Sequence, residues 1–387
     1  MKLFDTATKS YIPFVPGPLV KIYVCGITPY DSAHLGHLFT FMTYDLLVRR
    51  LQDMGHEVQM VRNVTDVDEP IYKKARELGI SYSDLATAET KSFQDTLEQL
   101  HFRRPFAEPL ASEYVQQMAE AVKKLLDGGY AYELDGDVYY DTEKYGRFGQ
   151  FSGFNHRLLL AFMADRGGDP ERLGKKNPLD FLLWKGVSDP LNLPRWESVV
   201  GIGRPGWHIE CTVMSSALLG DSYDIHGGGS DLIYPHHESE IAQSYGLSGK
   251  NPAKIWTHVS PMLFAGEKMS KSLGNLVFAK DLLKDDDAAV IRLALMHYHH
   301  RIGGEWQPEL LCEGRHLYEK IHAASSRATV EQAVVLQAEI RAALDDDLNT
   351  IEVINAFYRF IGSVTEQESN AEAQATVRSI LELLGLV

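Results

Sequence analysis

Apolar residues near the start of the chain form a short continuous run, followed by a longer stretch with helical spacing. Residues 21–25 (Lys-Ile-Tyr-Val-Cys) form one short run, which Gly26 and Pro29 should end, and they predict a buried strand. Residues 39–51 place phenylalanine, methionine and leucine on one helix face, and residues 57–61 (Glu-Val-Gln-Met-Val) predict a second strand. A strand, a helix and a second strand in this order predict the start of a parallel α/β sheet.

The same alternation of predicted strands and helices returns in the second half of the chain. Residues 83–126 predict two amphipathic helices, whereas residues 130–196 are rich in glycine, proline and aromatic residues and lack long periodic runs. We therefore expect an insertion between two halves of one α/β domain. The elements predicted after it are a helix after Trp207, a strand at 222–225, a helix from about Glu238 and a strand at 255–259.

After about Pro308 the pattern of apolar positions becomes helical throughout and stays so to Val387. Three aspartates, 345–347, separate two of these helical stretches, and Asn349 or Thr350 is suited to cap the next helix. We expect four parts: the first half of the α/β domain at 1–129, a connective insertion at 130–196, the second half at 197–306, and a C-terminal helical bundle at 307–387.

Composition narrows the class of protein. The chain has 387 residues, of which 44% are hydrophobic and 24% charged, as is typical of a globular protein with a large core. Its first residues contain no apolar stretch suited to a signal peptide, and no run of about 18 apolar residues predicts a membrane span. The net charge of −15 argues against a large nucleic-acid-binding face. Cys25, Cys211 and Cys312 are scattered and odd in number, which favours a reducing cytoplasm over a disulfide framework.

Two short motifs far apart in the chain carry the first candidate chemistry. The segment from His34 to His37 (His-Leu-Gly-His) follows the first predicted strand, and Lys268 to Ser272 (Lys-Met-Ser-Lys-Ser) lies in the second half. Two imidazoles beside the N–H groups of a helix start would stabilise charge on ATP phosphates. Lys268 and Lys271 offer a cationic clamp for pyrophosphate. Each motif alone is explained as readily by a satisfied histidine pair or a solvated loop, but together they predict activation of a carboxylate as an adenylate.

A second set of residues has the composition of a metal site. Cys25 ends the first strand, Cys211 lies in a predicted helix, and His236 and Glu240 lie four apart, so they share a helix face. Two thiolates, an imidazole and a carboxylate suit a tetrahedral Zn²⁺, which binds a substrate thiol better than a hydroxyl. No C-x-x-C pair supports the set, Cys211 is also explained as a small buried apolar residue, and His237 competes with His236.

A glycine-rich turn follows another predicted strand. Residues 226–231 read His-Gly-Gly-Gly-Ser-Asp, and the three glycines let a ligand approach the backbone closely. Asp231 is suited to accept hydrogen bonds from ribose hydroxyls. A flexible turn would explain the glycines equally well. In a parallel sheet this turn, Cys25 and residues 63–65 would all lie at the carboxyl ends of strands, where ligands bind.

These motifs resemble those of the class I aminoacyl-tRNA synthetases, and within them the cysteinyl group. The resemblance covers about residues 15–360 and implies a Rossmann-like nucleotide-binding domain with a connective insertion. The matching segments are 24–26, 34–37, 63–66, 206–211, 224–231, 235–240 and 268–272.

Within this superfamily the chain is similar to the mycothiol ligases, which join cysteine to the amine of glucosaminyl-inositol. Residues 25–31 (Cys-Gly-Ile-Thr-Pro-Tyr-Asp), Pro70 and the segment 166–180 are typical of the ligases. The chain also stops where a synthetase would continue into an anticodon-binding domain. Glu240 and His226 are instead typical of the synthetase branch.

The resemblance implies a ligase that makes cysteinyl-AMP from L-cysteine and ATP with Mg²⁺ and passes the cysteine to an amino-sugar amine. It implies one Zn²⁺ per chain, a cytoplasmic monomer, and neither tRNA nor a membrane as a partner. A truncated cysteine–tRNA ligase, or a cysteine-adding paralogue with another small-molecule acceptor, is the alternative. A paralogue that only binds nucleotide is disfavoured because every motif histidine and lysine is present.

The resemblance also implies roles for individual residues. The phosphates would be stabilised by His34, His37, Lys268 and Lys271, and zinc would be held by Cys25, Cys211 and His236, with Glu240 as a fourth or outer partner. The cysteinyl adenylate would contact Cys25, Gly26, Ile27, Thr28, Thr40, Asn63, Val64, Thr65, Trp207, Gly229, Ser230 and Asp231.

Overall fold

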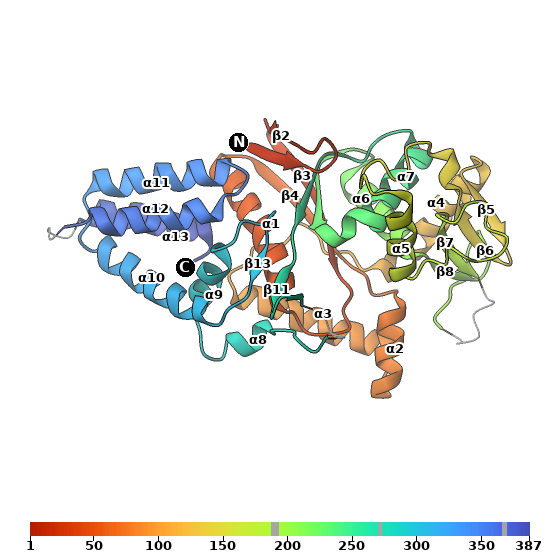
Figure 1. Cartoon of the computed structure of the whole chain (residues 1–387), viewed down its shortest axis with the longest axis horizontal. Coiled ribbons are helices and arrows are strands. Elements are labelled where there is room, and N and C mark those ends of the chain that lie inside the picture. The colour runs from red at the N-terminus through yellow and green to blue at the C-terminus, as the bar shows by residue number, and fades with distance from the viewer. Residues whose placement is uncertain (187–192, 270–272, 366–369) are drawn as a thin grey trace.

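The computed structural model describes residues 1–186, 193–269, 273–365 and 370–387. A four-stranded parallel sheet with the order β10-β9-β3-β4 lies at its centre (Figure 1). The predicted parallel sheet is therefore confirmed. Its strands are β3 (Leu19–Ile27), β4 (Glu57–Val64), β9 (Tyr223–Gly229) and β10 (Ala253–Val259).

The alternation of side chains along β3 determines which residues meet on each face of the sheet. Ile22 and Val24 pack into one core with helix α1 (Leu35–Asp53), whereas Tyr23 and Cys25 pack into a second core with α6 (Trp207–Leu219). Cys25 therefore faces α6, the helix that carries Cys211. Strand β3 continues through Gly26 to Ile27 and is longer than the sequence predicted.

Helices connect and cover these strands. The two helices expected between residues 83 and 126 are present as α3 (Tyr82–Gln99) and α4 (Val115–Asp127), and α7 (Glu238–Ser248) confirms the helix expected from Glu238. Helix α2 (Glu69–Leu78) was not predicted, although Asp68 caps its first turn and Pro70 lies within that turn. Short helical turns lie at η1 (Ala111–Tyr114), η2 (Thr142–Lys144), η3 (Ser230–Leu232) and η4 (Ile233–His237).

A separate antiparallel sheet, with the order β5-β6-β7-β8, interrupts the α/β domain. Buried Asp137 joins its segments, because it pairs with Arg172 at 2.6 Å and Lys185 at 2.9 Å. The sheet lies at the opposite end of the molecule from the C-terminal helices (Figure 1). Division of the chain at residues 129, 196 and 306 stays a prediction. The elements are β5 (Ala131–Leu134), β6 (Asp137–Tyr140), α5 (His156–Asp165), β7 (Phe181–Gly186) and β8 (Gly203–Pro205).

The C-terminal part is helical, as predicted, and Asn349 caps one helix by accepting a hydrogen bond from Glu352 N at 3.2 Å. Buried Arg292 ties this part to α1, because its guanidinium donates to Asp45 Oδ2 at 2.6 Å and to Leu384 O at 3.0 Å. The helices are α8 (Ala279–Leu282), α9 (Ala288–Met296), α10 (Glu309–Ser325), α11 (Val330–Asp345), α12 (Thr350–Ser363) and α13 (Ala371–Leu384).

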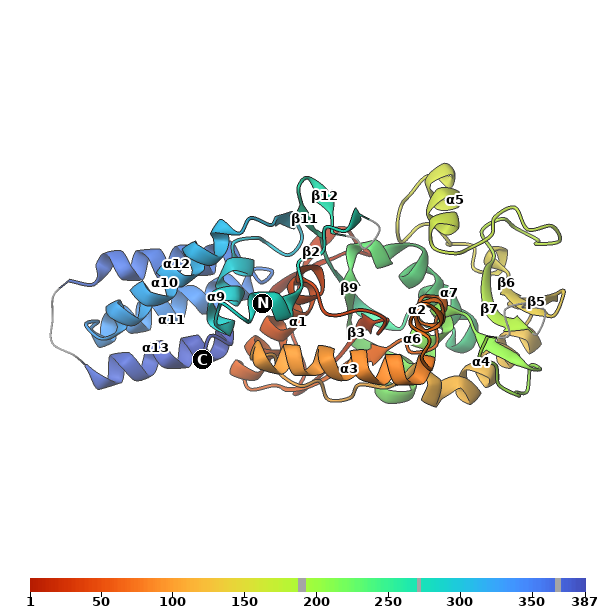
Figure 2. The same cartoon turned by 90° about the horizontal axis from the view of Figure 1, so that it is seen from below.

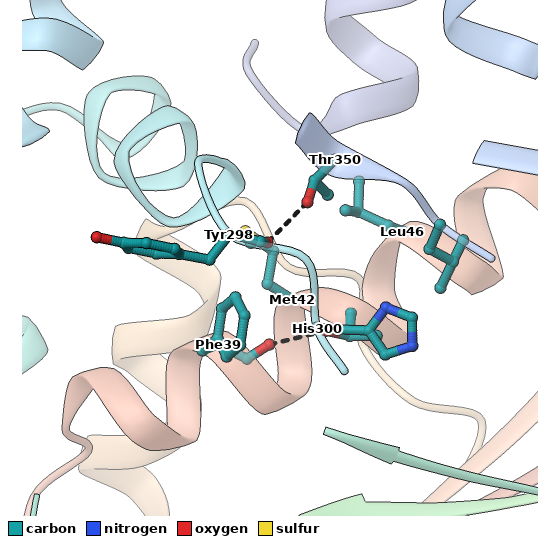
Figure 3. A pocket seen from close by; sticks show the side chains of 8 residues that line it. Phe39, Met42, Leu46, Tyr298, His300 and Thr350 are labelled. Carbon is teal, nitrogen blue, oxygen red and sulfur yellow. Dashed lines mark hydrogen bonds between the residues drawn. The ribbon is translucent and has the colours of Figure 1, made fainter. Parts of the chain in front are cut away.

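The seam between α1 and the helical part is closely packed. Figure 3 shows Phe39, Met42 and Leu46 of α1 facing Tyr298 and His300, and the hollow that they line has no room for a water molecule. The Thr350 hydroxyl closes the seam by donating to Tyr298 O at 2.8 Å.

Two small sheets complete the fold. A hairpin of β1 (Lys2–Asp5) and β2 (Ser10–Pro13) begins the chain. A three-stranded sheet, β12-β11-β13, carries the beginning of the lysine motif; its strands are β11 (Met262–Phe264), β12 (Glu267–Lys268) and β13 (Gly304–Glu305). Within the described ranges, the helices are each too short or too polar to cross a membrane.

Candidate active site

Backbone hydrogen bonds bring the two distant motifs together. The segment that follows the lysine motif runs beside the start of α1, where Leu35 N donates to Val277 O at 2.9 Å and Ala279 N donates to Ala33 O at 3.0 Å. Lys280 also donates to Ser32 Oγ at 3.1 Å. The histidine motif is therefore anchored to the chain that leaves the lysine motif.

The two motif histidines stack on each other at the start of α1. Their ring centroids lie 3.9 Å apart, and His34 caps the helix by accepting a hydrogen bond from Gly36 N at 3.1 Å. Burial lowers the pKa of His34 to about 4 and that of His37 well below its usual range. Both imidazoles are therefore neutral near pH 7, and their N–H groups are suited to donate hydrogen bonds to phosphate oxygens.

Lys268 of the second motif contacts the glycine-rich turn. Its Nζ lies 2.9 Å from Asp231 Oδ2, so the two predicted nucleotide-binding segments meet directly. Burial alone would raise the pKa of Asp231, but the positive charges of Lys268 and Arg166 lower it to about 2. Lys271, the other predicted catalytic lysine, lies outside the described residues, as do Ser270 and Ser272.

The carboxyl ends of β3 and β4 are joined by a close backbone contact. Gly26 N donates to Asn63 Oδ1 at 2.8 Å, Asn63 Nδ2 donates to Thr65 Oγ1 at 3.1 Å, and Thr65 N donates to Ile27 O at 2.9 Å. A Cβ at residue 26 would lie 1.7 Å from Asn63 O, so only glycine fits there. The strand ends expected to face the adenylate are thus fixed against each other.

The other predicted adenylate contacts lie around these strand ends. Trp207 begins α6 and stacks on His236 with ring centroids 4.3 Å apart, while Thr28 Oγ1 lies 3.4 Å from Asp68 Oδ2. The Thr40 hydroxyl donates to Gly36 O within α1 at 3.0 Å, and Val64 is buried at the end of β4. Gly229 and Ser230 lie where β9 ends and η3 begins. Adenylate binding by these residues stays a prediction.

Cys25, Cys211, His236 and Glu240, the four residues predicted to hold a metal, are buried together with their ligand atoms within 4.8 Å of one another. The sulfurs of Cys25 and Cys211 lie 3.7 Å apart, and His236 Nε2 lies 3.2 Å from Glu240 Oε1. Around a tetrahedral zinc with ordinary bond lengths, two sulfurs lie about 3.8 Å apart and a nitrogen and an oxygen about 3.3 Å apart. The donor set and its spacing therefore fit zinc.

The protonation of the two cysteines also suits a metal site. Burial alone would raise the pKa of the Cys211 thiol, but the hydrogen bond from Cys25 and the proximity of His236 lower it well below its usual range. Burial and neighbouring Cys211 raise the pKa of Cys25. The lowered pKa of Cys211 favours its thiolate, which is the form that binds a metal.

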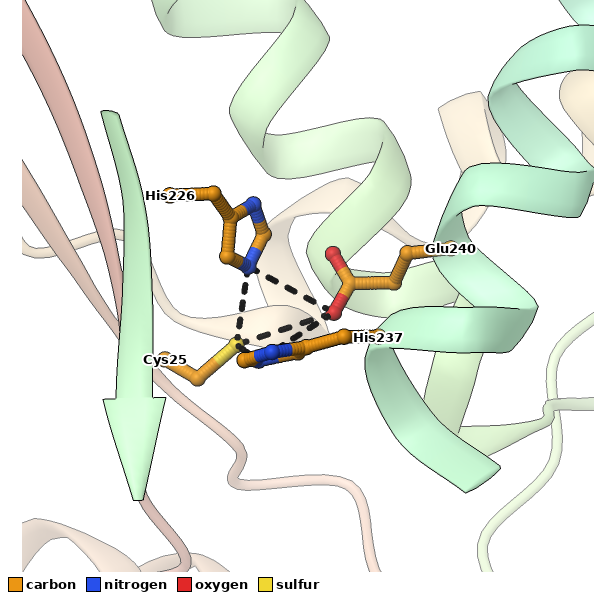
Figure 4. A group of neighbouring side chains, drawn as sticks. All are labelled: Cys25, His226, His237 and Glu240. Atoms are coloured by element: carbon orange, nitrogen blue, oxygen red, sulfur yellow. Dashed lines mark hydrogen bonds and ion pairs between the residues drawn. The ribbon is translucent and has the colours of Figure 1, made fainter. Parts of the chain in front are cut away.

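A second group that could hold a metal uses the same Cys25 and Glu240 but replaces the other two residues with His226 and His237 (Figure 4). His226 Nε2 lies 3.5 Å and His237 Nε2 3.3 Å from Cys25 Sγ. The competition between His236 and His237 seen in the sequence therefore persists, and both groups converge on one buried point at the end of β3.

Outer histidines orient the inner ones. His208 and His236 are hydrogen-bonded through their Nδ1 atoms at 2.9 Å, and His237 Nδ1 is bonded to His258 Nε2 at 2.7 Å. Ligating histidines usually have such a partner on the second ring nitrogen. Sequence analysis missed His208 and His258, and it gave His226 no metal role. Alternation along β9 and β10 was the only signal available for His226 and His258.

Comparisons with known proteins agree with this arrangement. Residues 14–316 match the profile of the tRNA synthetases class I (C) catalytic domain. A methionyl-tRNA synthetase of Mycobacterium tuberculosis, solved in complex with methionyl-adenylate, has the same fold with a TM-score of 0.64 and 14% identity, covering 95% of this chain and 88% of that one.

Curated relatives match over nearly the whole chain. An L-cysteine:1D-myo-inositol 2-amino-2-deoxy-alpha-D-glucopyranoside ligase of Streptosporangium roseum is 40% identical over 388 residues, covering 99% of this chain and 94% of the relative. A ligase of the same name from Streptomyces avermitilis is 41% identical over 391 residues, covering 100% and 95%. This chain belongs to that ligase family, and its catalytic domain is of the class I tRNA synthetase type.

Proposed function

We propose that this protein is an ATP-dependent ligase that joins L-cysteine to the amine of 1D-myo-inositol 2-amino-2-deoxy-alpha-D-glucopyranoside. The observation that carries the proposal is the convergence of a thiol-binding type of metal site with an adenylation site. Cys25 at the end of β3 belongs to the first, and residues 26–27 lead directly into the second. A thiol-bearing carboxylic acid is the substrate that would occupy both.

The first step forms cysteinyl-AMP. A carboxylate oxygen of cysteine attacks the α-phosphorus of ATP, the bond between the α-phosphorus and the bridging oxygen breaks, and pyrophosphate leaves with Mg²⁺. The neutral imidazoles of His34 and His37 donate hydrogen bonds to phosphate oxygens as charge accumulates there. Lys268, with Lys271, offsets the charge of the pyrophosphate. Asp231 accepts hydrogen bonds from the ribose.

Cys25, Cys211 and His236 would hold a zinc ion, with Glu240 as the fourth or outer partner. When bound, zinc supplies a Lewis-acid site that takes the substrate thiolate as a ligand and discriminates against serine, whose hydroxyl binds zinc more weakly. Trp207, stacked on His236, would help to hold that ring in place.

The second step transfers cysteine to the acceptor. The free amine attacks the carbonyl carbon of the adenylate, a C–N bond forms, the C–O bond to AMP breaks, and the amine proton passes to solvent. The residues that contact the acceptor are not assigned. We place the enzyme in the cytoplasm, because the free thiols of Cys25 and Cys211 need reducing surroundings. That the enzyme is a monomer stays a prediction.

Amino-acid-dependent ATP–pyrophosphate exchange tests the first step. Cysteine should support exchange and serine should not, whereas an absence of cysteine-dependent exchange would contradict the proposal. Addition of the amino sugar should then release AMP. Charging of tRNA in place of amide formation would assign the protein to the alternative, a cysteine–tRNA ligase.

A further inference from the structure

Asp231 forms a second ion pair besides the one with Lys268. Arg166, the residue that follows helix α5 of the insertion, places its Nη2 3.1 Å from Asp231 Oδ2. Lys268 Nζ lies 2.9 Å from the same oxygen. Figure 2 shows α5 and β12 on the same side of the molecule, and Asp231 joins residues from both segments.

These contacts contribute little to the stability of the fold. The side chains of Arg166, Asp231 and Lys268 are 34%, 38% and 49% exposed, and ion pairs with such exposure are screened by solvent. By contrast, the insertion has its own buried anchor at Asp137, which is fully buried and paired with Arg172 and Lys185. A role in the site therefore explains the Arg166 contact better than a role in folding.

The two cations fix the orientation of the Asp231 carboxylate. Both bind Oδ2, whereas Oδ1 lies over Gly229, where a Cβ would approach it to 2.5 Å. An ionised carboxylate can accept about four hydrogen bonds, so acceptor capacity remains on Oδ1. The cations also hold the pKa of Asp231 at about 2, which keeps the carboxylate ionised throughout the physiological range.

We propose that Arg166 is a positioning residue for ATP, which together with Lys268 holds Asp231 Oδ2 so that Oδ1 faces the ribose hydroxyls. The inference rests on the proposed function, because it assumes that Asp231 binds ribose. It assigns the segment after α5 a part in nucleotide selection. It also links the insertion to nucleotide binding, because Asp231 would contact both the ribose and Arg166 of the insertion.

Discrimination between ATP and 2′-deoxy-ATP or 3′-deoxy-ATP tests this role, because a purely structural residue would not change it. The readout is the ratio of kcat/KM for ATP to that for each deoxy analogue in cysteine-dependent pyrophosphate exchange. Asp231→Asn should lower the larger of these two ratios about tenfold, as expected for a lost hydrogen bond to a charged group. Arg166→Gln should lower it about threefold, because Lys268 still holds Oδ2, and Arg166→Lys should restore most of it. Arg157→Gln is the matched control, because Arg157 is an exposed arginine on helix α5, which precedes Arg166.

The double variant Arg166→Gln/Asp231→Asn distinguishes a role of Arg166 through Asp231 from a role that is independent of Asp231. If Arg166 acts through Asp231, the double variant should have the same ratio as Asp231→Asn alone. An unchanged ratio in Arg166→Gln, or a further loss in the double variant, would overturn the role of Arg166 and leave the proposed ligase intact. An unchanged ratio in Asp231→Asn would instead remove the ribose assignment on which the inference rests. If Arg166→Gln folds poorly, Arg166→Met, which also removes the charge, takes its place with the same expected loss.

Discussion

Replacement of the outer histidines should identify which of the two overlapping ligand groups binds zinc. His208 is bonded to His236, a member of the group with two cysteines, whereas His258 is bonded to His237, a member of the group in Figure 4. Phenylalanine keeps a ring of similar size at either position but has no nitrogen. Both sites already have aromatic neighbours, Phe181 beside His208 and Phe151 beside His258.

The expected loss follows from the geometry of the inner ligand. Without the 2.9 Å bond to His208, the His236 ring loses the partner that fixes its tautomer, and its Nε2 is held less firmly at 3.2 Å from Glu240 Oε1. Loss of such an outer partner typically weakens metal binding about 10- to 100-fold, which is about 1.4–2.7 kcal/mol. His208→Phe should therefore raise the Kd for zinc by this factor, while His258→Phe should change it less than about threefold.

Competition with a chromogenic zinc chelator measures both Kd values on the same scale. Circular dichroism should show that both variants keep the fold of the parent chain. Weaker zinc binding in His258→Phe with normal binding in His208→Phe would refute the assignment to Cys211 and His236. It would place the metal with His226 and His237 instead.

Three further predictions concern single residues. Cys211→Ser should lower zinc content, measured by atomic emission, and cysteine affinity while ATP binding stays near normal; full zinc with normal cysteine affinity would argue against the metal assignment. Gly26→Ala should abolish pyrophosphate exchange, because its Cβ would lie 1.7 Å from Asn63 O, and an active variant would show that the two strand ends need not touch. His34 has a pKa of about 4 in the folded chain and an unfolded value near 6.5, so the unfolded chain binds the proton more readily. The free energy of unfolding should thus fall as pH drops from 6.5 towards 4, and urea titrations of His34→Asn should show a shallower fall.

The local sequence pattern was sufficient for the central sheet and for the C-terminal helices. Buried parallel strands are apolar over most of their length; residues 22–25 have this character, whereas residues 57–61 (Glu-Val-Gln-Met-Val) start with a polar residue and become apolar towards their end. The antiparallel sheet of the insertion could not be predicted, because its strands are short; β8 has three residues. Helix α2 was missed because its apolar positions are few, although Asp68 and Pro70 form a recognisable start.

Sequence motifs were sufficient to predict the main site residues. Residues that reach the site only through the tertiary structure were missed. The cysteines of β3 and α6, and His236 with Glu240, do converge, because strand alternation and helix spacing orient them. Both adjacent histidines, His236 and His237, reach that point because of the η4 turn before α7, where sequence periodicity gives no information. The contact between Arg166 and Asp231 joins residues far apart in the chain, and only the fold reveals it.

Formation of the amide product tests the central claim most directly. The enzyme, loaded with zinc, would be incubated with L-cysteine, ATP, Mg²⁺ and 1D-myo-inositol 2-amino-2-deoxy-alpha-D-glucopyranoside, and the products would be resolved by mass spectrometry. The account predicts cysteinyl amide and AMP in equal amounts, with neither formed at a comparable rate when serine replaces cysteine. Cysteine-dependent exchange without any amide, together with cysteine attached to tRNA, would contradict it.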